Sequence, residues 1–233
     1  MKDLIIAVTG LNAIDSPGPG IPVIRALRQS KHFKARIIGL AYENLEPGIY
    51  MHDMVDKTYQ IPYPTSGQDT LLSRLQYIHA KERLDVIIPN FDAELFSFIK
   101  LRPVLEDMGI RSLLPTVEQF EARLKANLGA FGEKYDIPVP LGSAAFTLQE
   151  LQEQLRGYTY PVVVKGKYYE AYTAHNYEQA ERAFYKISTK WGTPIILQQF
   201  IKGQEVNVTA LGDGNGKLIG AVPMRKTYIT DKG

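Results

Sequence analysis

The N-terminal part of the chain alternates short apolar runs with segments of helical periodicity. Such alternation is typical of βαβ units, in which helices connect the strands of a parallel sheet. The apolar runs predict strands at Leu4–Val8, Arg36–Leu40, Asp56–Gln60 and Asp85–Ile88, and the periodic segments predict helices at Ile21–Gln29, Thr70–Lys81 and Glu94–Met108. The last of these strands is apolar beyond its first residue, so we expect it to be buried on both faces.

A different pattern begins near residue 115, where we place a domain boundary. Thr116 offers an N-cap for one helix that carries Phe120, Leu124 and Leu128. Asp136–Gly142 alternates proline with apolar residues and is therefore expected to be extended. The pattern beyond it predicts helices at Leu148–Leu155 and Glu178–Trp191, strands at Pro161–Lys165 and Pro194–Phe200, and then an antiparallel hairpin of Glu205–Leu211 and Lys217–Val222. We therefore predict an α/β protein with more than one domain.

Composition narrows the function classes. The 233 residues are 45% hydrophobic and 22% charged, as in folded globular domains, and none is cysteine. The absence of cysteine excludes disulfides, thiolate metal sites, iron–sulfur clusters and thiol nucleophiles. The spacing of the four histidines argues against a helical or finger-type zinc site. They are His32, His52, His79 and His175.

Charge and hydropathy argue against two kinds of partner. The 27 basic and 25 acidic residues are interspersed and give a net charge of +2, without the basic stripe that follows a nucleic-acid backbone. No apolar stretch approaches the roughly 20 residues that cross a bilayer. The first apolar run, Leu4–Val8, is also too short for a signal peptide. We therefore expect a cytoplasmic protein whose partners are neither nucleic acid nor membrane.

The loop between the first strand and the first helix, Gly10–Gly20, is a candidate ligand site. In open α/β sheets this position holds anions on free backbone N–H groups. Gly18 and Gly20 supply half of a dinucleotide fingerprint, but Val23 stands where its third small residue belongs, and three prolines remove backbone donors. A rigid connector is one interpretation. The position favours another, an anion or carboxylate subsite for a substrate that includes Gly18 and Gly20.

Asp92 and Glu94 form a carboxylate pair just after the strand Asp85–Ile88. An open α/β sheet places its ligands at that end of its strands. Both residues are equally suited to the first turn of the helix that follows. A substrate site and a helix start therefore remain equal alternatives for this pair. Phosphate-binding P-loops and G-x-S-x-G elbows are absent from the sequence.

The segment Ile195–Glu205 leads from an apolar strand into polar residues, a glycine and an acid. A planar base needs apolar walls and hydrogen bonds at its edge, and a carboxylate accepts hydrogen bonds from both ribose hydroxyls. The segment therefore suits an adenosine. The plain alternative is a strand, a turn and a hairpin, with Glu205 in solvent.

Taken together, three blocks of the sequence resemble the ATP-grasp superfamily. They are Lys125 with Asp136–Pro140, then Tyr160–Lys165, then Leu197–Glu205. The N-terminal region resembles the domain that precedes the ATP-grasp fold in the carbamoyl-phosphate-synthase-like and biotin-carboxylase-like branch. The residues that carry this second likeness are Gly10, Pro17–Gly20 and Pro89–Glu94. The resemblance covers the whole chain.

This resemblance implies three parts and two cofactors. Residues 1–115 would form a Rossmann-like pre-ATP-grasp domain, 116–200 the small α+β lobe, and 201–233 the truncated start of a large lobe. The implied cofactors are ATP and Mg²⁺, and relatives hold the metal with carboxylates and an asparagine on late strands. We therefore expect the metal ligands beyond Gly233 and none within this chain. We favour a fragment of a longer ligase, inactive alone, over a shortened relative that binds without turnover.

The resemblance also assigns an ATP site. The implied contacts are Lys125 and Lys165 to the phosphates, Gln198, Gln199, Phe200 and Ile201 to the adenine, and Glu205 to the ribose. Many relatives have an acid where Gln198 stands, whereas an amide both donates and accepts hydrogen bonds. The loop over the phosphates would be Gly166–Tyr172, in which aromatic side chains replace the glycines of relatives. Lys167 in this loop is either a further phosphate contact or a solvated lysine.

The activity implied is that of an ATP-dependent ligase, which transfers the γ-phosphoryl group to a carboxylate and lets an amine or ammonia attack the acyl phosphate. Small-molecule carboxylate and amine substrates would be its partners, and a homodimer stays open. One alternative is a non-catalytic adenine-nucleotide-binding module. Another is an NAD(P)-dependent oxidoreductase. That interpretation predicts a small residue at position 23, where Val23 stands, and an acid at the end of the second strand, where Glu43 lies a little late.

Overall fold

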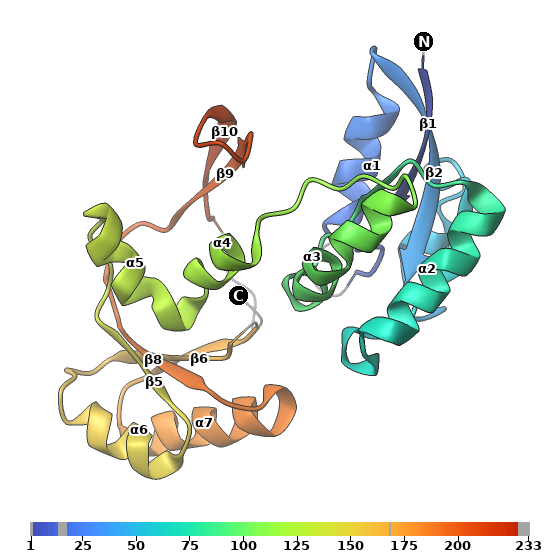
Figure 1. The fold of residues 1–233 in the computed structure, drawn as a ribbon. Helices are drawn as coiled ribbons and strands as arrows, with labels where there is room; N and C mark the ends of the chain where they lie inside the picture. The colour runs from blue at the N-terminus through green and yellow to red at the C-terminus, as the bar shows by residue number, and fades with distance from the viewer. Residues whose placement is uncertain (1, 14–17, 168, 228–233) are drawn as a thin grey trace. The chain divides into compact units, whose positions relative to one another are not determined.

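The computed structural model describes residues 2–13, 18–167 and 169–227. The chain divides into two compact units, Met1–Val117 and Glu118–Gly233 (Figure 1). Within the described ranges, no helix has both the length and the apolar character needed to cross a bilayer.

The first unit is built on a parallel sheet with strand order β3-β2-β1-β4. Its strands are β1 (Lys2–Val8), β2 (Phe33–Ala41), β3 (Lys57–Gln60) and β4 (Val86–Ile88); its helices are α1 (Gly20–Arg28), α2 (Gln68–Glu82) and α3 (Asp92–Asp107), with short 3₁₀ turns at Pro47–Tyr50 and Pro64–Ser66. Side chains alternate along β1, so Ile6 and Val8 pack with α1 while Ala7 packs with α2 and α3 on the other face. The predicted parallel sheet is confirmed.

The strand β4 is less buried than expected. Ile87 is fully buried, but Val86 and Ile88 are only half-buried. The strand order explains this, because β4 lies beside β1 and has only a single bridge, between Val86 and Arg111, on its other side within the described residues. An apolar run therefore marked a strand correctly and overstated its burial.

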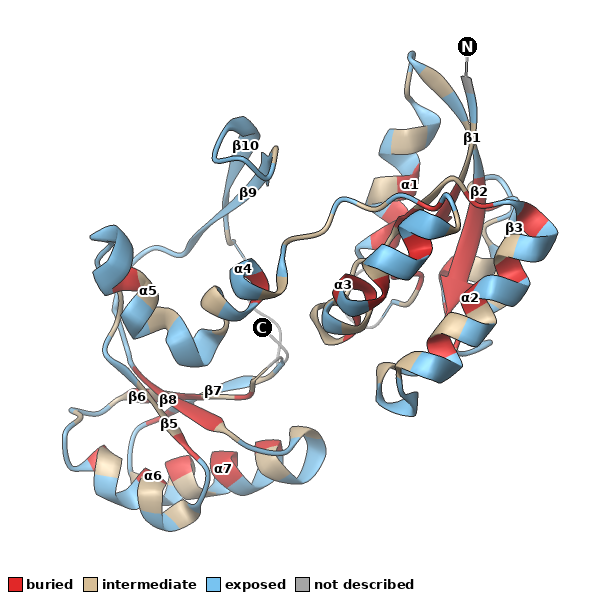
Figure 2. Ribbon diagram, viewed as in Figure 1, coloured by how far each residue is buried: buried red, intermediate tan, exposed pale blue. Residues whose placement is uncertain are grey.

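The second unit is built on an antiparallel sheet with strand order β5-β8-β6-β7. Its strands are β5 (Gly142–Ala145), β6 (Val162–Lys165), β7 (Ala171–Ala174) and β8 (Ile195–Gln199), and the helices that pack on them are α6 (Leu148–Leu155) and α7 (Tyr177–Trp191). Thr147 caps α6 and Asn176 caps α7, each by accepting a hydrogen bond from a backbone N–H of the first turn. One face of the sheet packs on both helices through Leu151, Val164, Ile187 and Leu197 (Figure 2).

Two short strands escaped the sequence pattern. The strand β5 consists of glycine, serine and alanine, which have little tendency to form strands, and β7 is a run of only four residues. They form because β8 and β6 offer them hydrogen-bonding edges. The second unit is therefore antiparallel from its first strand, and not only from the hairpin onward as the pattern indicated.

The single helix expected to carry Phe120, Leu124 and Leu128 is wrong. The chain instead forms α4 (Val117–Ala122), a 3₁₀ turn η3 (Lys125–Asn127) and α5 (Leu128–Tyr135). Leu124 between them is extended, with ψ of 139°, and this conformation interrupts the helix. The Asn127 side chain donates to the carbonyl of Glu121, a group that a continuous helix would have used itself.

The predicted hairpin is confirmed as β9 (Val206–Gly212) and β10 (Leu218–Arg225). The Asp213 carboxylate accepts hydrogen bonds from the N–H groups of Asn215 and Lys217 and so shapes the turn. All described residues of both strands are exposed, and β9 and β10 are pale blue in Figure 2. The predicted fold class, an α/β chain with a parallel N-terminal sheet followed by an α+β lobe, is confirmed.

Candidate functional site

The second unit has a hollow on the face of its sheet that α6 and α7 do not cover. In β8, Leu197 belongs to the core beneath these helices, so its neighbours Ile196 and Gln198 point to the other face. A shallow hollow, open to solvent, lies there. The residues that line it are Lys125, Ala126, Leu128, Gly129, Pro140, Gly142, Ser143, Ile196 and Gln198. Most of this lining is small or apolar, as a planar base requires.

Lys165 lies on the same face, at the end of β6. It stands opposite Ile196 in the pair of β6 and β8, and opposed side chains of an antiparallel pair point the same way. Burial lowers the pKa of Lys165 and the charge of Lys125 lowers it further, while the carboxylate of Glu205 opposes both effects. Three charged groups that are distant in sequence therefore act on one another in this unit.

Two ammonium groups at one place make a local excess of positive charge. Like charges repel one another, and a bound anion lowers this repulsion. Lysine ammonium groups bind phosphate oxygens as point charges. The pair Lys125 and Lys165 thus has the chemistry of a phosphate site.

Gln198 and Gln199 take different places at the end of β8. Gln198 is 9% exposed and lines the hollow. Gln199 is exposed and ties β8 to the segment before β5, since its N–H donates to the carbonyl of Leu141 at 2.8 Å and its Oε1 accepts from the N–H of Leu141 at 3.3 Å. Phe200 and Ile201, which follow, are exposed. Of the four residues predicted at the base, only Gln198 lines the hollow in the described structure.

Glu205 stands at the base of the hairpin and is exposed. Its Oε1 lies 3.3 Å from the Nζ of Lys226, and its carbonyl accepts from the Lys226 N–H at 3.1 Å. The ion pair keeps the carboxylate beside β10, and its charge still raises the pKa of Lys165. The carboxylate is accessible to a ligand with hydroxyl donors.

The loop predicted to cover the phosphates is a tight turn between β6 and β7. The Gly166 N–H donates to the carbonyl of Glu170 at 3.0 Å, and a Cβ on Gly166 would come within 2.2 Å of the Tyr169 carbonyl oxygen. Lys167 is half-buried in the turn, and Tyr168 lies outside the described residues. Glycine is therefore required at the first position of the turn.

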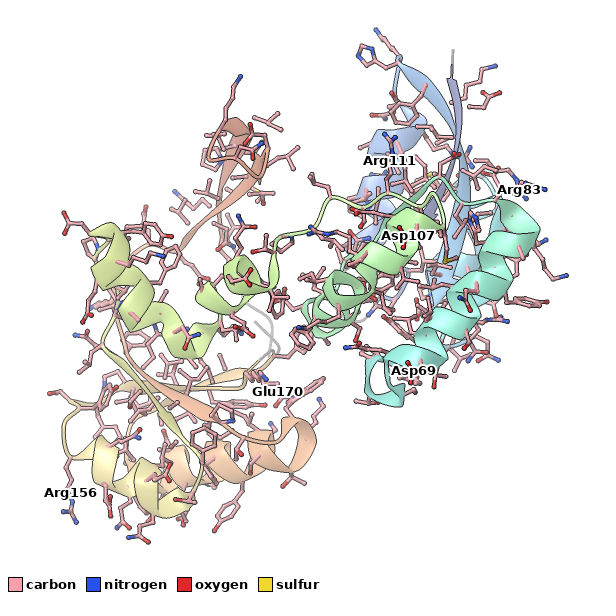
Figure 3. All side chains as sticks on the ribbon, in the orientation of Figure 1. Asp69, Arg83, Asp107, Arg111, Arg156 and Glu170 are labelled. Atoms are coloured by element: carbon pink, nitrogen blue, oxygen red, sulfur yellow. The ribbon has the colours of Figure 1, made fainter. Side chains whose placement is uncertain are left out.

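Glu170 fastens this turn to α7 (Figure 3). Its Oε1 lies 2.7 Å from the Nζ of Lys190 and accepts from the Trp191 indole N–H at 3.3 Å. Its Oε2 accepts from the Tyr172 hydroxyl at 3.0 Å. The hydrogen bond from Lys190 lowers the pKa of Glu170. Sequence reasoning missed this residue, because no local pattern links it to the end of a helix twenty positions later.

The comparisons with known proteins agree with this geometry. No family model matches the chain. A segment of 176 residues is 28% identical to the carbamoyl phosphate synthase large chain of Clostridium beijerinckii, and the match covers 72% of this chain and 15% of that one. Among solved structures, the biotin carboxylase domain of a Hydrogenobacter thermophilus 2-oxoglutarate carboxylase, in complex with MgADP and bicarbonate, aligns with a TM-score of 0.64 and 20% identity, over 93% of this chain and 49% of that one.

An L-amino acid ligase from Bacillus licheniformis aligns with a TM-score of 0.61 and 17% identity, over 95% of this chain and 50% of that one. The chain thus spans about half of these solved chains and a far smaller share of the synthase. The chain resembles ATP-grasp enzymes in part of its sequence and in its fold. The resemblance seen in its three sequence blocks is confirmed, and the chain is related to ATP-grasp carboxylases and ligases.

In the N-terminal unit, the glycines of the first loop allow its backbone segments to approach one another closely. The Gly18 N–H donates to the carbonyl of Asn12 at 2.6 Å, and the Gly20 N–H donates to that of Gly10 at 2.9 Å. A Cβ on Gly20 would come within 2.1 Å of the Thr9 carbonyl oxygen. Loop carbonyls therefore already use the N–H groups of Gly18 and Gly20, and the substrate subsite expected at this loop stays a prediction.

Glu94 lies in the interior of the first unit. It is 1% exposed, and its carboxylate accepts from the Thr9 hydroxyl at 2.5 Å, from the Tyr42 hydroxyl, and from the N–H groups of Asn90 and Phe91. Burial raises the pKa of Glu94 although these hydrogen bonds lower it. Asp92 begins α3 and is half-buried. The two carboxylates are thus not equivalent, and Glu94 joins the ends of β1, β2 and β4.

Sequence reasoning missed Glu46, a second buried carboxylate near Glu94. Glu46 is 4% exposed, and its Oε1 accepts from the N–H of Tyr42 at 2.7 Å. Burial raises the pKa of Glu46, and the charge of Glu94 adds to this effect. The signal was weak, because the residue lies in an irregular loop after β2. Among the described side chains, no group of three or more His, Asp or Glu residues could hold a metal ion.

Proposed function

We propose that this chain is the ATP-binding part of an ATP-dependent ligase that joins a carboxylate to an amine or to ammonia. The observation that carries the proposal is the pair Lys125 and Lys165 beside the hollow that Gln198 lines. The two cations attract an anion, and the hollow beside them offers apolar walls and one amide. A nucleoside triphosphate combines a polyanion with a planar base and satisfies both.

Each residue has a separate role in this proposal. Lys125 and Lys165 neutralise the phosphate oxygens and hold the triphosphate in place. Gln198 hydrogen-bonds the edge of the base, and Glu205 accepts hydrogen bonds from the ribose hydroxyls. The turn that begins at Gly166 covers the phosphates. These roles position and neutralise the nucleotide, which is most of what a protein contributes to phosphoryl transfer.

The reaction proposed has two steps. A carboxylate oxygen of the substrate attacks the γ-phosphorus, the bond from that phosphorus to the β-bridging oxygen breaks, and ADP leaves. The product is an acyl phosphate. The amine nitrogen then attacks the acyl carbon, loses a proton and expels inorganic phosphate. We draw no step through magnesium, because the described side chains include no group of three metal-ligating residues.

The nicotinamide alternative finds little support in the first unit. A dinucleotide site needs free N–H groups at the start of α1 for the pyrophosphate. Those of Gly18 and Gly20 are bonded to loop carbonyls. The adenine-nucleotide-binding module uses the same residues as the ligase and differs only in turnover.

Titration calorimetry with ADP, ATP and NAD tests the proposal. Wild-type protein is expected to bind ADP and ATP and not NAD. Lys165→Ala should weaken ADP binding by about 10- to 100-fold, the effect of losing one charge-assisted contact. Lys217→Ala is the matched control, because Lys217 is an exposed lysine in the hairpin turn of the same unit and does not line the hollow.

An unchanged ADP affinity in the Lys165→Ala protein would overturn the assignment of the site, as would the lack of any adenine-nucleotide binding. Release of phosphate from ATP, measured with panels of carboxylates and amines, separates the ligase from the binding module. Nucleotide binding without carboxylate-dependent phosphate release would favour the module.

A further inference from the structure

Gln198 is unusual among the polar residues of the second unit. Of the described residues from 118 onward, it is the only one with a polar side chain that is buried. Its side-chain amide makes no hydrogen bond within the described part of the chain, although it lines the hollow. Because the hollow is open to solvent, water can hydrogen-bond this amide until a ligand takes its place.

Other side-chain amides near β5 and β8 already make hydrogen bonds within the unit. The Gln154 side chain accepts from the Ser143 hydroxyl at 2.7 Å and donates to the Ala144 carbonyl at 2.9 Å. The Gln199 side chain accepts from the Leu141 N–H. The Ser143 hydroxyl, which also lies 3.1 Å from the Tyr158 hydroxyl, is committed as well. Gln198 is therefore the uncommitted neutral polar group that faces a ligand in the hollow.

The chemistry of an amide decides which base edge it can bind. At the position where adenine carries an amine donor, guanine carries a carbonyl acceptor. A carboxylate at this place accepts from the amine and repels the carbonyl. An amide satisfies either group, because a half-turn about its terminal bond presents its oxygen or its NH₂. Of the remaining lining, Lys125 is assigned to the phosphates and the Ser143 hydroxyl already donates to Gln154, while Ala126, Gly129 and Gly142 carry no polar side chain that would discriminate between the two bases.

We propose that Gln198 makes this pocket accept guanine as well as adenine nucleotides. This inference rests on the proposed nucleotide site and adds its base selectivity. A carboxylate at this position would restrict the site to adenine. The Gln198 amide imposes no such restriction, and the phosphate contacts of Lys125 and Lys165 serve both nucleotides equally.

Competition binding with ADP, GDP and UDP tests the inference. In the wild-type protein, the dissociation constants of ADP and GDP should agree within about tenfold, since one hydrogen-bonded edge is satisfied in both. Gln198→Glu should leave ADP binding almost unchanged and weaken GDP binding by about 10- to 100-fold. Gln152→Glu, the same change at an exposed position of α6, should leave the ratio of the two constants as it is in the wild type.

The outcomes separate this inference from the proposed function. ADP binding with GDP weaker by more than about 100-fold in the wild type would overturn the inference and leave the nucleotide site standing. An unchanged ratio in the Gln198→Glu protein, with its circular dichroism unaltered, would also overturn it. Binding of neither purine nucleotide would overturn the proposed function itself. UDP binding as tight as that of ADP would show that Gln198 reads no base edge and would overturn the inference.

Discussion

Glu82 shows at the scale of one residue how charge is made compatible with burial in the first unit. Its side chain is 5% exposed at the end of α2, 2.5 Å from Arg36 and 2.8 Å from Lys57, and it also accepts from the Tyr59 hydroxyl. Burial by itself raises the pKa of Glu82, but hydrogen bonds from Lys57, Tyr59 and Arg36 outweigh it and hold the pKa at about 2. The carboxylate thus joins β2, β3 and α2.

Glu82→Gln should lower the free energy of unfolding of the first unit by about 1–3 kcal/mol at neutral pH, since the two cations it pairs with are half-exposed and partly screened. The folded-state pKa lies below the ordinary 4.5, so this stabilisation is present above pH 4.5 and is lost as the pH falls toward 2. Hydrogen exchange in β2, β3 and α2, measured against pH, tests the prediction.

Glu106→Gln is the control for this prediction. Glu106 is an exposed carboxylate on α3, 3.8 Å from Arg102, and such a pair contributes about 0.5 kcal/mol or less. Equal exchange in the wild-type and Glu82→Gln proteins at neutral pH would contradict the role given to Glu82.

At the scale of the element, the turn between β6 and β7 gains its order from α7. The three donors of Tyr172, Lys190 and Trp191 converge on Glu170, and the Tyr169 ring lies 5.1 Å from the Trp191 ring. Glu170 adopts a positive φ of 66°, a conformation that its side-chain contacts help to maintain. The ring of Tyr169 thus has a partner outside the turn.

Glu170→Gln should loosen this turn without unfolding the unit. The loss of the charged contact to the half-exposed Lys190 is expected to cost about 1 kcal/mol, or about fivefold faster hydrogen exchange in the turn. The fluorescence of Trp191, the single tryptophan of the chain, should change because its indole N–H loses a charged acceptor.

Glu178→Gln, at an exposed position in the first turn of the same helix, is the control for the element. Its exchange in the turn and its tryptophan emission should match those of the wild type. A Glu170→Gln protein that behaved in the same way would show that the side-chain contacts of Glu170 do not order the turn.

At the scale of the whole molecule, the candidate nucleotide site belongs to the second unit, while the buried carboxylates Glu46 and Glu94 belong to the first. A ligand that binds only the folded state stabilises the unit that holds its site. The two units should therefore respond differently to nucleotide.

ADP at one hundred times its dissociation constant should add about 2.7 kcal/mol to the stability of the second unit. Hydrogen exchange should slow around Lys125, Lys165 and Gln198, and the loop Gly10–Gly20 should stay as it is. Addition of NAD should change neither unit. Protection of the first loop by NAD would contradict this prediction and restore the dinucleotide interpretation.

The sequence by itself determined most of the elements, because hydrophobic periodicity is a local property of the chain. The strands β1, β2, β6 and β8 and the helices α2, α6 and α7 lie within a few residues of their predicted positions. The prediction from sequence failed where tertiary contacts outweigh the local preference of the residues. The strands β5 and β7 depend on partners far along the chain, and the break at Leu124 depends on a bond between Asn127 and Glu121.

The three blocks that indicated the superfamily could also be recognised from the sequence, since each is a short run of neighbouring residues. Only the tertiary structure decided which side chains meet. The register of β6 against β8 places Lys165 opposite Ile196. The charges of Lys125 and Glu205 both act on the pKa of Lys165. The same structure used the N–H groups of Gly18 and Gly20 inside their own loop and left the Gln198 amide without a partner. Proximity between distant segments arises from packing, and a local pattern cannot encode it.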